Sequence, residues 1–257
     1  GAQNRRLSSL ECHDIMCKVG EIVVSGGVRR SAMISLSNLS DDRMRHAKSG
    51  NWWETAPHRA LANNSVSYTE KPDMETFLRE WTALVESKSG ERGIFNRQAS
   101  KKQAAKNGRR DTEWEFGTNP CSEIILRPYQ FCNLSEVVVR ATDDLKSLSN
   151  KVRLATIIGT LQSSLTKFPY LRKVWQTNTE EERLLGVSLT GIMDNPLLTA
   201  KNKGLAQTLD HLRLVAVDTN KEWAERLGVQ QSTAITCVKP SGTVSQLVDS
   251  ASGIHAR

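Results

Sequence analysis

A thiol that lies between an amide and a carboxylate is the most specific chemical pattern in this chain. Residues 119–123 read NPCSE, so Asn119, Cys121 and Glu123 occupy alternate positions. Alternate side chains of an extended backbone point to the same side, and Pro120 excludes a helix here. We therefore expect the three side chains to face one small volume. A hydrogen-bonding amide, a reactive sulfur and a base within reach of one substrate form a catalytic set.

Each of these residues also has an ordinary interpretation. Cys121 could be a buried, inert cysteine, and Asn119 a turn residue before proline. Glu123 could be a carboxylate on the surface. Cys132 follows Cys121 by eleven positions and could exchange electrons with another sulfur, or simply pack in the core beside Phe131. The residues alone leave these alternatives open.

Two glycine-bearing segments stand out, and the first of them is a candidate for binding phosphate. Ser241, Gly242 and Thr243 follow an expected strand at 233–238. A glycine-permitted turn before a helix exposes backbone N–H groups that favour phosphate, although a plain strand-to-helix turn has the same pattern. The second segment, residues 25–31, combines two glycines with two arginines and could equally be a surface turn.

Cys12, His13 and Cys17 have residue types that bind metals. A structural zinc site needs a second pair of ligands at a similar spacing, and the sequence has none nearby. We therefore expect an ordinary helix here and no metal. Cys237 lies in an apolar strand and is expected in the core.

The composition favours a globular protein without a membrane segment. The chain has 257 residues, of which 38% are hydrophobic and 25% are charged, and its net charge is +7. No apolar run approaches the roughly 20 residues that cross a bilayer, and five scattered cysteines fit a reducing compartment. We expect a cytoplasmic protein with no membrane partner. The basic stretch 101–110 lacks aromatic residues, so we expect an exposed connection and no nucleic-acid partner.

The pattern of apolar residues predicts alternating strands and helices. Helices are expected at 10–19, 41–50, 73–89, 154–165 and 205–227. Strands are expected at 22–24, 32–36, 61–68, 124–126, 137–139, 185–189 and 233–238. The apolar residues of two helices are expected on buried faces, namely Met74, Phe77, Leu78, Trp81, Leu84 and Val85, and Leu154, Ile157, Ile158, Leu161 and Leu165. This alternation indicates an α/β fold with mainly parallel strands, but it does not distinguish a barrel from an open sheet.

The cysteine segment resembles a known family. Asn-Pro-Cys-x-Glu followed by Cys-Asn-Leu-Ser-Glu is similar to the finger loop of ribonucleotide reductases. The short interval between the cysteines is closest to the adenosylcobalamin-dependent, class II enzymes, and to their triphosphate-reducing subtype. Residues 25–31 resemble the family's effector loop and residues 239–245 its phosphate loop, in the family's order.

The resemblance implies a fold and an activity. The fold would be a partial ten-stranded α/β barrel with the Cys121 loop buried at its centre. Residues 1–257 would be an incomplete catalytic barrel domain, truncated at both ends. The complete enzyme would use adenosylcobalamin to reduce ribonucleotides, as triphosphates, to deoxyribonucleotides for DNA synthesis. A class I large subunit, or a non-catalytic module that binds nucleotides or nucleic acid, is the alternative.

The resemblance also implies a role for each candidate residue of the finger loop. Cys121 would carry a thiyl radical that takes the 3′ hydrogen of the ribose. Glu123 would accept the 3′-hydroxyl proton, and Asn119 would hold a ribose hydroxyl. Cys132 would deliver reducing equivalents and form a disulfide with a cysteine that this chain lacks. The chain alone would therefore be inactive, and a thioredoxin-like protein would reduce the complete enzyme.

The two loops would bind nucleotides. Ser241, Gly242 and Thr243 would hold the substrate phosphates. Gly26, Gly27 and Arg29 would contact the substrate, in a loop whose shape is set by a bound deoxynucleotide effector.

Overall fold

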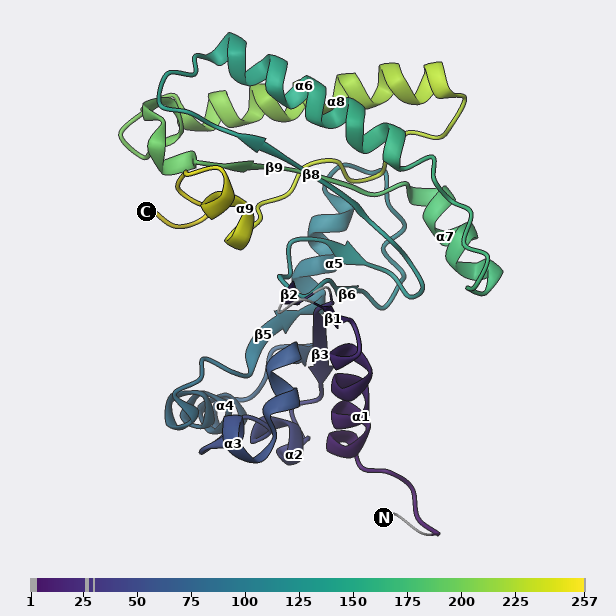
Figure 1. Cartoon of the computed structure of the whole chain (residues 1–257), viewed down its shortest axis with the longest axis vertical. Coiled ribbons are helices and arrows are strands. Elements are labelled where there is room, and N and C mark those ends of the chain that lie inside the picture. Colours follow the sequence, from purple (N-terminus) through teal and green to yellow (C-terminus); the bar gives the residue numbers. More distant parts are fainter. Residues whose placement is uncertain (1–3, 26–27, 30, 257) are drawn as a thin grey trace. The chain divides into compact units, whose positions relative to one another are not determined.

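The computed structural model describes residues 4–25, 28–29 and 31–256. Two compact units divide the chain (Figure 1). The first unit consists of Gly1–Gln103 and Glu115–Ile125, and the second of Ala104–Trp114 and Leu126–Arg257. The predicted site residues Gly26 and Gly27 lie outside the described residues.

A parallel three-stranded sheet forms the centre of the first unit. Its order is β3-β4-β5, so β4 is paired on both sides. The strands are β3 (Met33–Ser37), β4 (Ala62–Tyr68) and β5 (Gly93–Asn96). The helices are α1 (Ser9–Glu21), α2 (Asp42–Arg45), α3 (Trp52–Thr55), α4 (Met74–Ser87), α5 (Arg97–Ala105) and the 3-10 turn η1 (Pro57–Leu61). Two short strand pairs are also present: β1 (Val24–Ser25) with β2 (Val28–Arg29), and β6 (Gly117–Thr118) with β7 (Ile125–Leu126).

Side-chain caps explain where two of these helices begin. The Ser8 hydroxyl accepts a hydrogen bond from the Glu11 backbone N–H, and the Glu11 carboxylate accepts one from the Ser8 backbone N–H. This capping box starts α1. Asp73 caps α4 by accepting a hydrogen bond from the Thr76 backbone N–H, without a reciprocal bond. The sequence predicted both helices at these places.

The predicted buried face of α4 is wrong. Met74, Leu78, Trp81 and Val85 are exposed, and α4 buries Glu80 and Ala83 instead. Glu80 accepts hydrogen bonds from Arg45 at 2.9 Å and from Arg92 at 2.6 and 2.8 Å. A buried carboxylate needs partners of opposite charge, so the orientation of α4 follows this ion network rather than its apolar stripe.

The second unit is a two-stranded parallel sheet covered by helices. β8 (Asn133–Val138) pairs with β9 (Leu185–Thr190), and α6 (Leu145–Gln162) and α8 (Leu205–Leu227) lie side by side on one face of the sheet (Figure 1). The core consists of Val137, Val139, Leu148, Val152, Ala155, Leu185, Val187, Leu198, Leu212, Ala216 and Ile235. The remaining elements are α7 (Lys173–Glu182), η2 (Ile192–Asp194), η3 (Pro196–Leu198) and α9 (Gly242–Leu247).

The expected strand at 233–238 forms only in part. Val187 donates to the Ile235 carbonyl at 2.8 Å and accepts from Cys237 at 3.1 Å, and a parallel bridge joins Val187 to Thr236. The segment therefore extends the β8–β9 sheet over a few residues before it turns into α9.

The predicted buried face of α6 is also wrong. Leu154, Ile158, Leu161 and Leu165 are exposed. The buried positions of α6 are Leu148, Val152, Ala155, Thr156, Gly159 and Thr160. The two threonines can be buried because their hydroxyls donate to the carbonyls of Val152 and Thr156, at 2.8 and 2.7 Å.

The basic stretch 101–110 is not simply an exposed connection. Lys101 and Lys102 lie in α5, whereas the Arg110 side chain is buried and donates to Glu182 at 2.8 and 3.0 Å. Arg109 donates to the Ser232 carbonyl at 2.9 Å. These arginines fix the second unit from within.

The α/β class with parallel main strands is confirmed. The described strands form open sheets of two or three strands, so the closed barrel stays a prediction for the longer protein. In the described part of the chain, no helix combines the length and apolarity that membrane crossing requires.

Candidate active site

Cys121 lies in a tight turn, which we call the cysteine turn (residues 119–122). The Ser122 amide donates to the Asn119 carbonyl at 2.9 Å, and Ser122 has a φ of 62°. Pro120 occupies the second position of the turn, where its fixed φ is favourable. The expected extended backbone is therefore wrong here, and simple alternation does not set the directions of the three candidate side chains.

Asn119 closes the loop that contains this turn. Its Oδ1 accepts a hydrogen bond from the Ile124 amide at 3.0 Å, and the neighbouring Thr118 hydroxyl donates to the Ile124 carbonyl at 2.9 Å. The turn-residue interpretation of Asn119 is therefore right at the level of local structure. With Oδ1 engaged, the Nδ2 group is the part of Asn119 that can donate to a substrate hydroxyl.

The cysteine turn is exposed. Cys121 and Ser122 are accessible to solvent, and Glu123 is half-buried. The prediction of a buried loop tip is wrong for this chain, because the sheets are open and the described residues do not enclose the thiol. The exposed thiol is two positions in sequence from Glu123, whose carboxylate has one buried oxygen, Oε2.

Asn63 of β4 contacts the cysteine turn and was not singled out in the sequence. Its Nδ2 donates to the Pro120 carbonyl at 2.8 Å. Asparagine is depleted in strands, so an Asn-Asn pair inside β4 is the signal that could have drawn attention to it. The contact spans 57 positions and has no local pattern.

The predicted phosphate segment forms a strand-to-helix turn in the second unit. Ser241 has a φ of 62° and precedes α9, and its buried hydroxyl donates to the Thr190 hydroxyl at 2.8 Å. Ser241 is therefore a structural residue as far as its side chain is concerned. Gly242 and Thr243 are exposed, and a Cβ added to Gly242 would meet nothing within 4 Å.

Close backbone contacts support this turn. A Cβ on Gly253 would lie 1.9 Å from the Lys239 carbonyl oxygen, and one on Gly191 would lie 2.4 Å from that of Val139. Only glycine allows such approaches. Gly253 therefore lets the chain pack closely against Lys239, just before the turn, whereas Gly191 lets the residue after β9 pack against Val139.

Cys132 is half-buried in the second unit, next to an aromatic cluster. The Phe131 ring lies 4.9 Å from that of Phe168 and 4.8 Å from that of Trp175, measured between centroids. Arg29, the remaining predicted residue of the effector loop, ends β2 and pairs with Val24.

The helix α1 carries a buried polar cluster. His13 Nε2 lies 3.0 Å from Asn64 Oδ1, and the buried Cys17 lies next to His13. Burial disfavours the charged Asp14 carboxylate, but hydrogen bonds and the charge of Arg59 outweigh it and lower the Asp14 pKa to about 2. These contacts attach α1 to β4 and η1.

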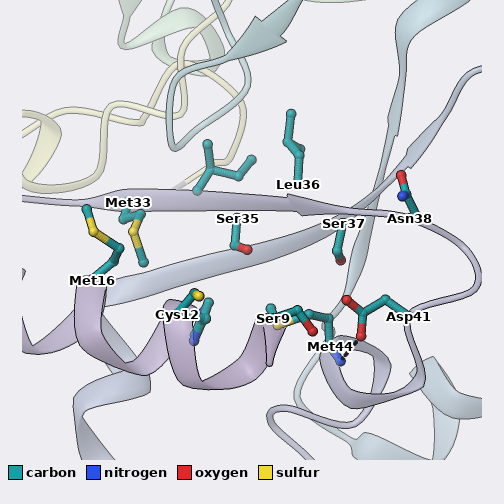
Figure 2. A pocket seen from close by; sticks show the side chains of 12 residues that line it. Ser9, Cys12, Met16, Met33, Ser35, Leu36, Ser37, Asn38, Asp41 and Met44 are labelled. Carbon is teal, nitrogen blue, oxygen red and sulfur yellow. Dashed lines mark hydrogen bonds between the residues drawn. The ribbon is translucent and has the colours of Figure 1, made fainter. Parts of the chain in front are cut away.

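A pocket of about 400 Å³ lies between α1 and β3. Figure 2 shows Cys12 and Met16 of α1 opposite Ser35 and Ser37 of β3, with Leu36 pointing away from the helix. The side chains of the cysteine turn do not line it. It is therefore separate from the candidate active site.

Comparison with known proteins finds relatives that share one name. The chain is 30% identical to an adenosylcobalamin-dependent ribonucleoside-triphosphate reductase of Lacticaseibacillus paracasei, over 98% of this chain and 36% of that protein. The reductase of the same name from Lactobacillus leichmannii is 29% identical, over 97% of this chain and 36% of its own length. No family model matches the chain.

The same likeness appears in the solved structures. A crystal structure of a B12-dependent, class II ribonucleotide reductase matches 96% of this chain and 37% of its own, with a TM-score of 0.73 and 25% identity. The chain resembles class II ribonucleotide reductases over nearly its whole length. A class Id ribonucleotide reductase alpha subunit of Actinobacillus ureae matches with a TM-score of 0.62 and 13% identity, which shows the shared reductase fold alone. The chain spans about 36% of the length of its curated relatives.

Proposed function

We propose that this chain is the part of a class II ribonucleotide reductase that carries the radical cysteine. The complete protein would reduce ribonucleoside triphosphates to deoxyribonucleotides and so supply DNA synthesis in the cytoplasm. Residues 1–257 would be an incomplete catalytic barrel domain, inactive by itself. The observation that carries this proposal is the Cys121 thiol on an exposed turn between Asn119 and Glu123, in a chain whose named relatives are reductases of this class.

Asn119 and Cys121 of the cysteine turn, together with the adjoining Glu123, would act on the ribose. The Cys121 thiyl radical takes the 3′ hydrogen atom, so that an S–H bond forms, the C3′–H bond breaks and the unpaired electron moves to C3′. Glu123 accepts the proton of the 3′ hydroxyl. Asn119 holds a ribose hydroxyl through Nδ2, because its Oδ1 is engaged by the Ile124 amide.

The exposed thiol of Cys121 would be accessible to adenosylcobalamin. A sulfur that loses a hydrogen atom to a large cofactor must be open on one side, and Cys121 is exposed while its backbone is held by hydrogen bonds. When bound, the cofactor supplies the homolysis that starts the radical reaction. The cysteine turn would hold the thiol in a fixed orientation toward it.

Cys132 would supply electrons for reduction at the 2′ position. It would form a disulfide with a cysteine outside this chain, and a thioredoxin-like protein would then reduce that disulfide. The half-buried thiol beside Phe131 is compatible with a redox role, since it is partly accessible. The full-length protein is therefore needed for turnover.

The remaining predicted residues would bind nucleotides. The exposed backbone at Gly242 and Thr243 would bind the substrate phosphates, whereas the Ser241 hydroxyl stabilises the turn. Because α9 is short, we attribute phosphate binding to individual backbone N–H groups and not to a helix dipole. Gly26, Gly27 and Arg29 would contact the substrate under the control of a deoxynucleotide effector.

Turnover of the full-length protein tests this proposal. The protein would be incubated with a ribonucleoside triphosphate, adenosylcobalamin and a dithiol, and deoxynucleotide would be measured by chromatography. We expect product only when the cofactor is present, and less from the matching diphosphate. Product that forms without adenosylcobalamin, or that requires a second radical-supplying protein, would instead indicate a class I large subunit.

A further inference from the structure

We propose that Asn63 is a positioning residue for Cys121. Its side-chain amide holds the cysteine turn against β4 and so sets the direction of the thiol. The consequence for catalysis rests on the proposed function of Cys121, whereas the structural contact does not.

The hydrogen bond from Asn63 reaches the atom that best controls Cys121. Asn63 Nδ2 lies 2.8 Å from the Pro120 carbonyl oxygen. That carbonyl belongs to the peptide unit that continues into the Cys121 nitrogen. A peptide unit is planar, so a bond that orients its C=O also orients the N–Cα bond of the next residue. The direction of the Cα–Cβ bond that leads to the sulfur then depends on the φ of Cys121, which the hydrogen bond from Ser122 to Asn119 restricts.

Two hydrogen bonds among the described residues of this loop act within it. Ser122 bonds to Asn119, and the Asn119 side chain bonds to the Ile124 amide. These contacts shape the turn but do not tie it to the sheet, so the turn should open more often once its anchor to β4 is lost. The Asn63 amide differs because it connects the turn to a strand of the sheet.

The strand that carries Asn63 is fixed on one side by β3. Asn63 is the register partner of Ile34 in the parallel β3–β4 pair. On the other side, pairing with β5 begins only at Ser65. The backbone of β4 around Asn63 therefore needs other partners on that side.

An ion pair supplies those partners. The Lys48 ammonium donates to the Ala62 backbone carbonyl, and the Glu91 carboxylate accepts a hydrogen bond from the backbone N–H of Asn64 at 3.0 Å. Lys48 and Glu91 are also paired with each other at 3.0 Å. The residues on both sides of Asn63 are thus held by charged groups that stand in for strand pairing. A side chain on such a rigid base can position another group accurately.

Loss of the Asn63 amide should release the turn and misdirect the thiol. A displacement of about 1 Å between reacting groups lowers rates by roughly 100-fold. We therefore expect Asn63→Asp to lower kcat by roughly ten- to 100-fold in the full-length enzyme. The KM should change little, because the change acts on the thiol rather than on the contacts of the nucleotide.

Hydrogen exchange in the full-length protein tests the structural part directly. Asn63→Asp keeps the shape but replaces the donor with a carboxylate that repels the Pro120 carbonyl. We expect the Ser122 and Ile124 amides to exchange about fivefold faster or more, as the loss of one hydrogen bond implies. Asn63→Ala should have the same effect, with folding of both variants checked by thermal melting.

Asn202→Asp is the matched control. Asn202 Nδ2 donates to the Leu197 carbonyl at 2.7 Å in the second unit, so the substitution removes the same kind of bond elsewhere. It should leave exchange at Ser122 and Ile124 unchanged. Unchanged exchange at these two amides in both Asn63 variants would overturn the inference, and so would faster exchange with normal kcat. If the unsubstituted protein formed no deoxynucleotide, the proposed function would fail, while the exchange rates would still decide whether Asn63 holds the turn.

Discussion

Gly242→Val should weaken nucleotide binding without harming the fold. A Cβ at this position would meet no protein atom within 4 Å, and Gly242 begins a helix, where valine is no worse than glycine. Stability should therefore change by less than about 1 kcal/mol. If the Gly242 amide binds phosphate, the branched side chain would block a charge-assisted hydrogen bond worth about 1.5–3 kcal/mol. Affinity should then fall roughly ten- to 100-fold.

Gly253→Ala provides the contrast. Its Cβ would overlap the Lys239 carbonyl oxygen at 1.9 Å and approach that of Leu189 at 3.0 Å, so the backbone must move. We expect a clearly lower melting temperature. Equilibrium binding of a ribonucleoside triphosphate to the full-length variants, alongside thermal melting, separates the two effects. Normal affinity in a well-folded Gly242→Val protein would refute the assignment of the phosphate site to this turn.

Two further predictions concern the stability of the first unit. Glu80→Gln removes the carboxylate that pairs with the buried Arg92 and leaves Arg45 with Asp42 as its acidic partner, so it should lower the free energy of unfolding by about 3 kcal/mol in urea titrations. Glu75→Gln, at an exposed pair on the same helix, should change the free energy of unfolding little, and equal effects of the two substitutions would contradict the role of the buried network. The pKa of Asp14 is lowered to about 2, so its ion pair with Arg59 stabilises the fold fully above the ordinary aspartate pKa of about 3.9, and this stabilisation is lost as the pH falls toward 2. The free energy of unfolding should therefore decrease less between pH 5 and pH 3 in Asp14→Asn than in the unsubstituted protein. An identical decrease in the two proteins would refute this role of Asp14.

The order of the helices and strands was largely predictable from the sequence. Local signals were sufficient for α1, α4, β4, β9 and α8, because caps, β-branched runs and helical spacing act over a few residues. The buried faces of α4 and α6 were not predictable in this way. A face is chosen by its partners: Glu80 turns inward to meet two arginines, and Thr156 and Gly159 turn inward where α6 packs against neighbouring elements.

The candidate site shows the same division. The residue types at 119–123 pointed to the chemistry, and the comparisons agree with the family that they suggested. The geometry differed, because Pro120 at the second position and Ser122 at positive φ make a turn where alternation assumed an extended chain. The Asn63 contact could not be read locally, since its partner lies 57 positions away.

Replacement of Cys121 by serine in the full-length protein tests the central claim most directly. Serine is nearly isosteric, and Cys121 is exposed, so folding and nucleotide affinity should be retained. An alcohol O–H is much harder to convert to a radical than a thiol, so we expect formation of deoxynucleotide in the presence of adenosylcobalamin and a dithiol to be abolished. Turnover by Cys121→Ser at a rate comparable to that of the unsubstituted enzyme would contradict the assignment of the radical to Cys121.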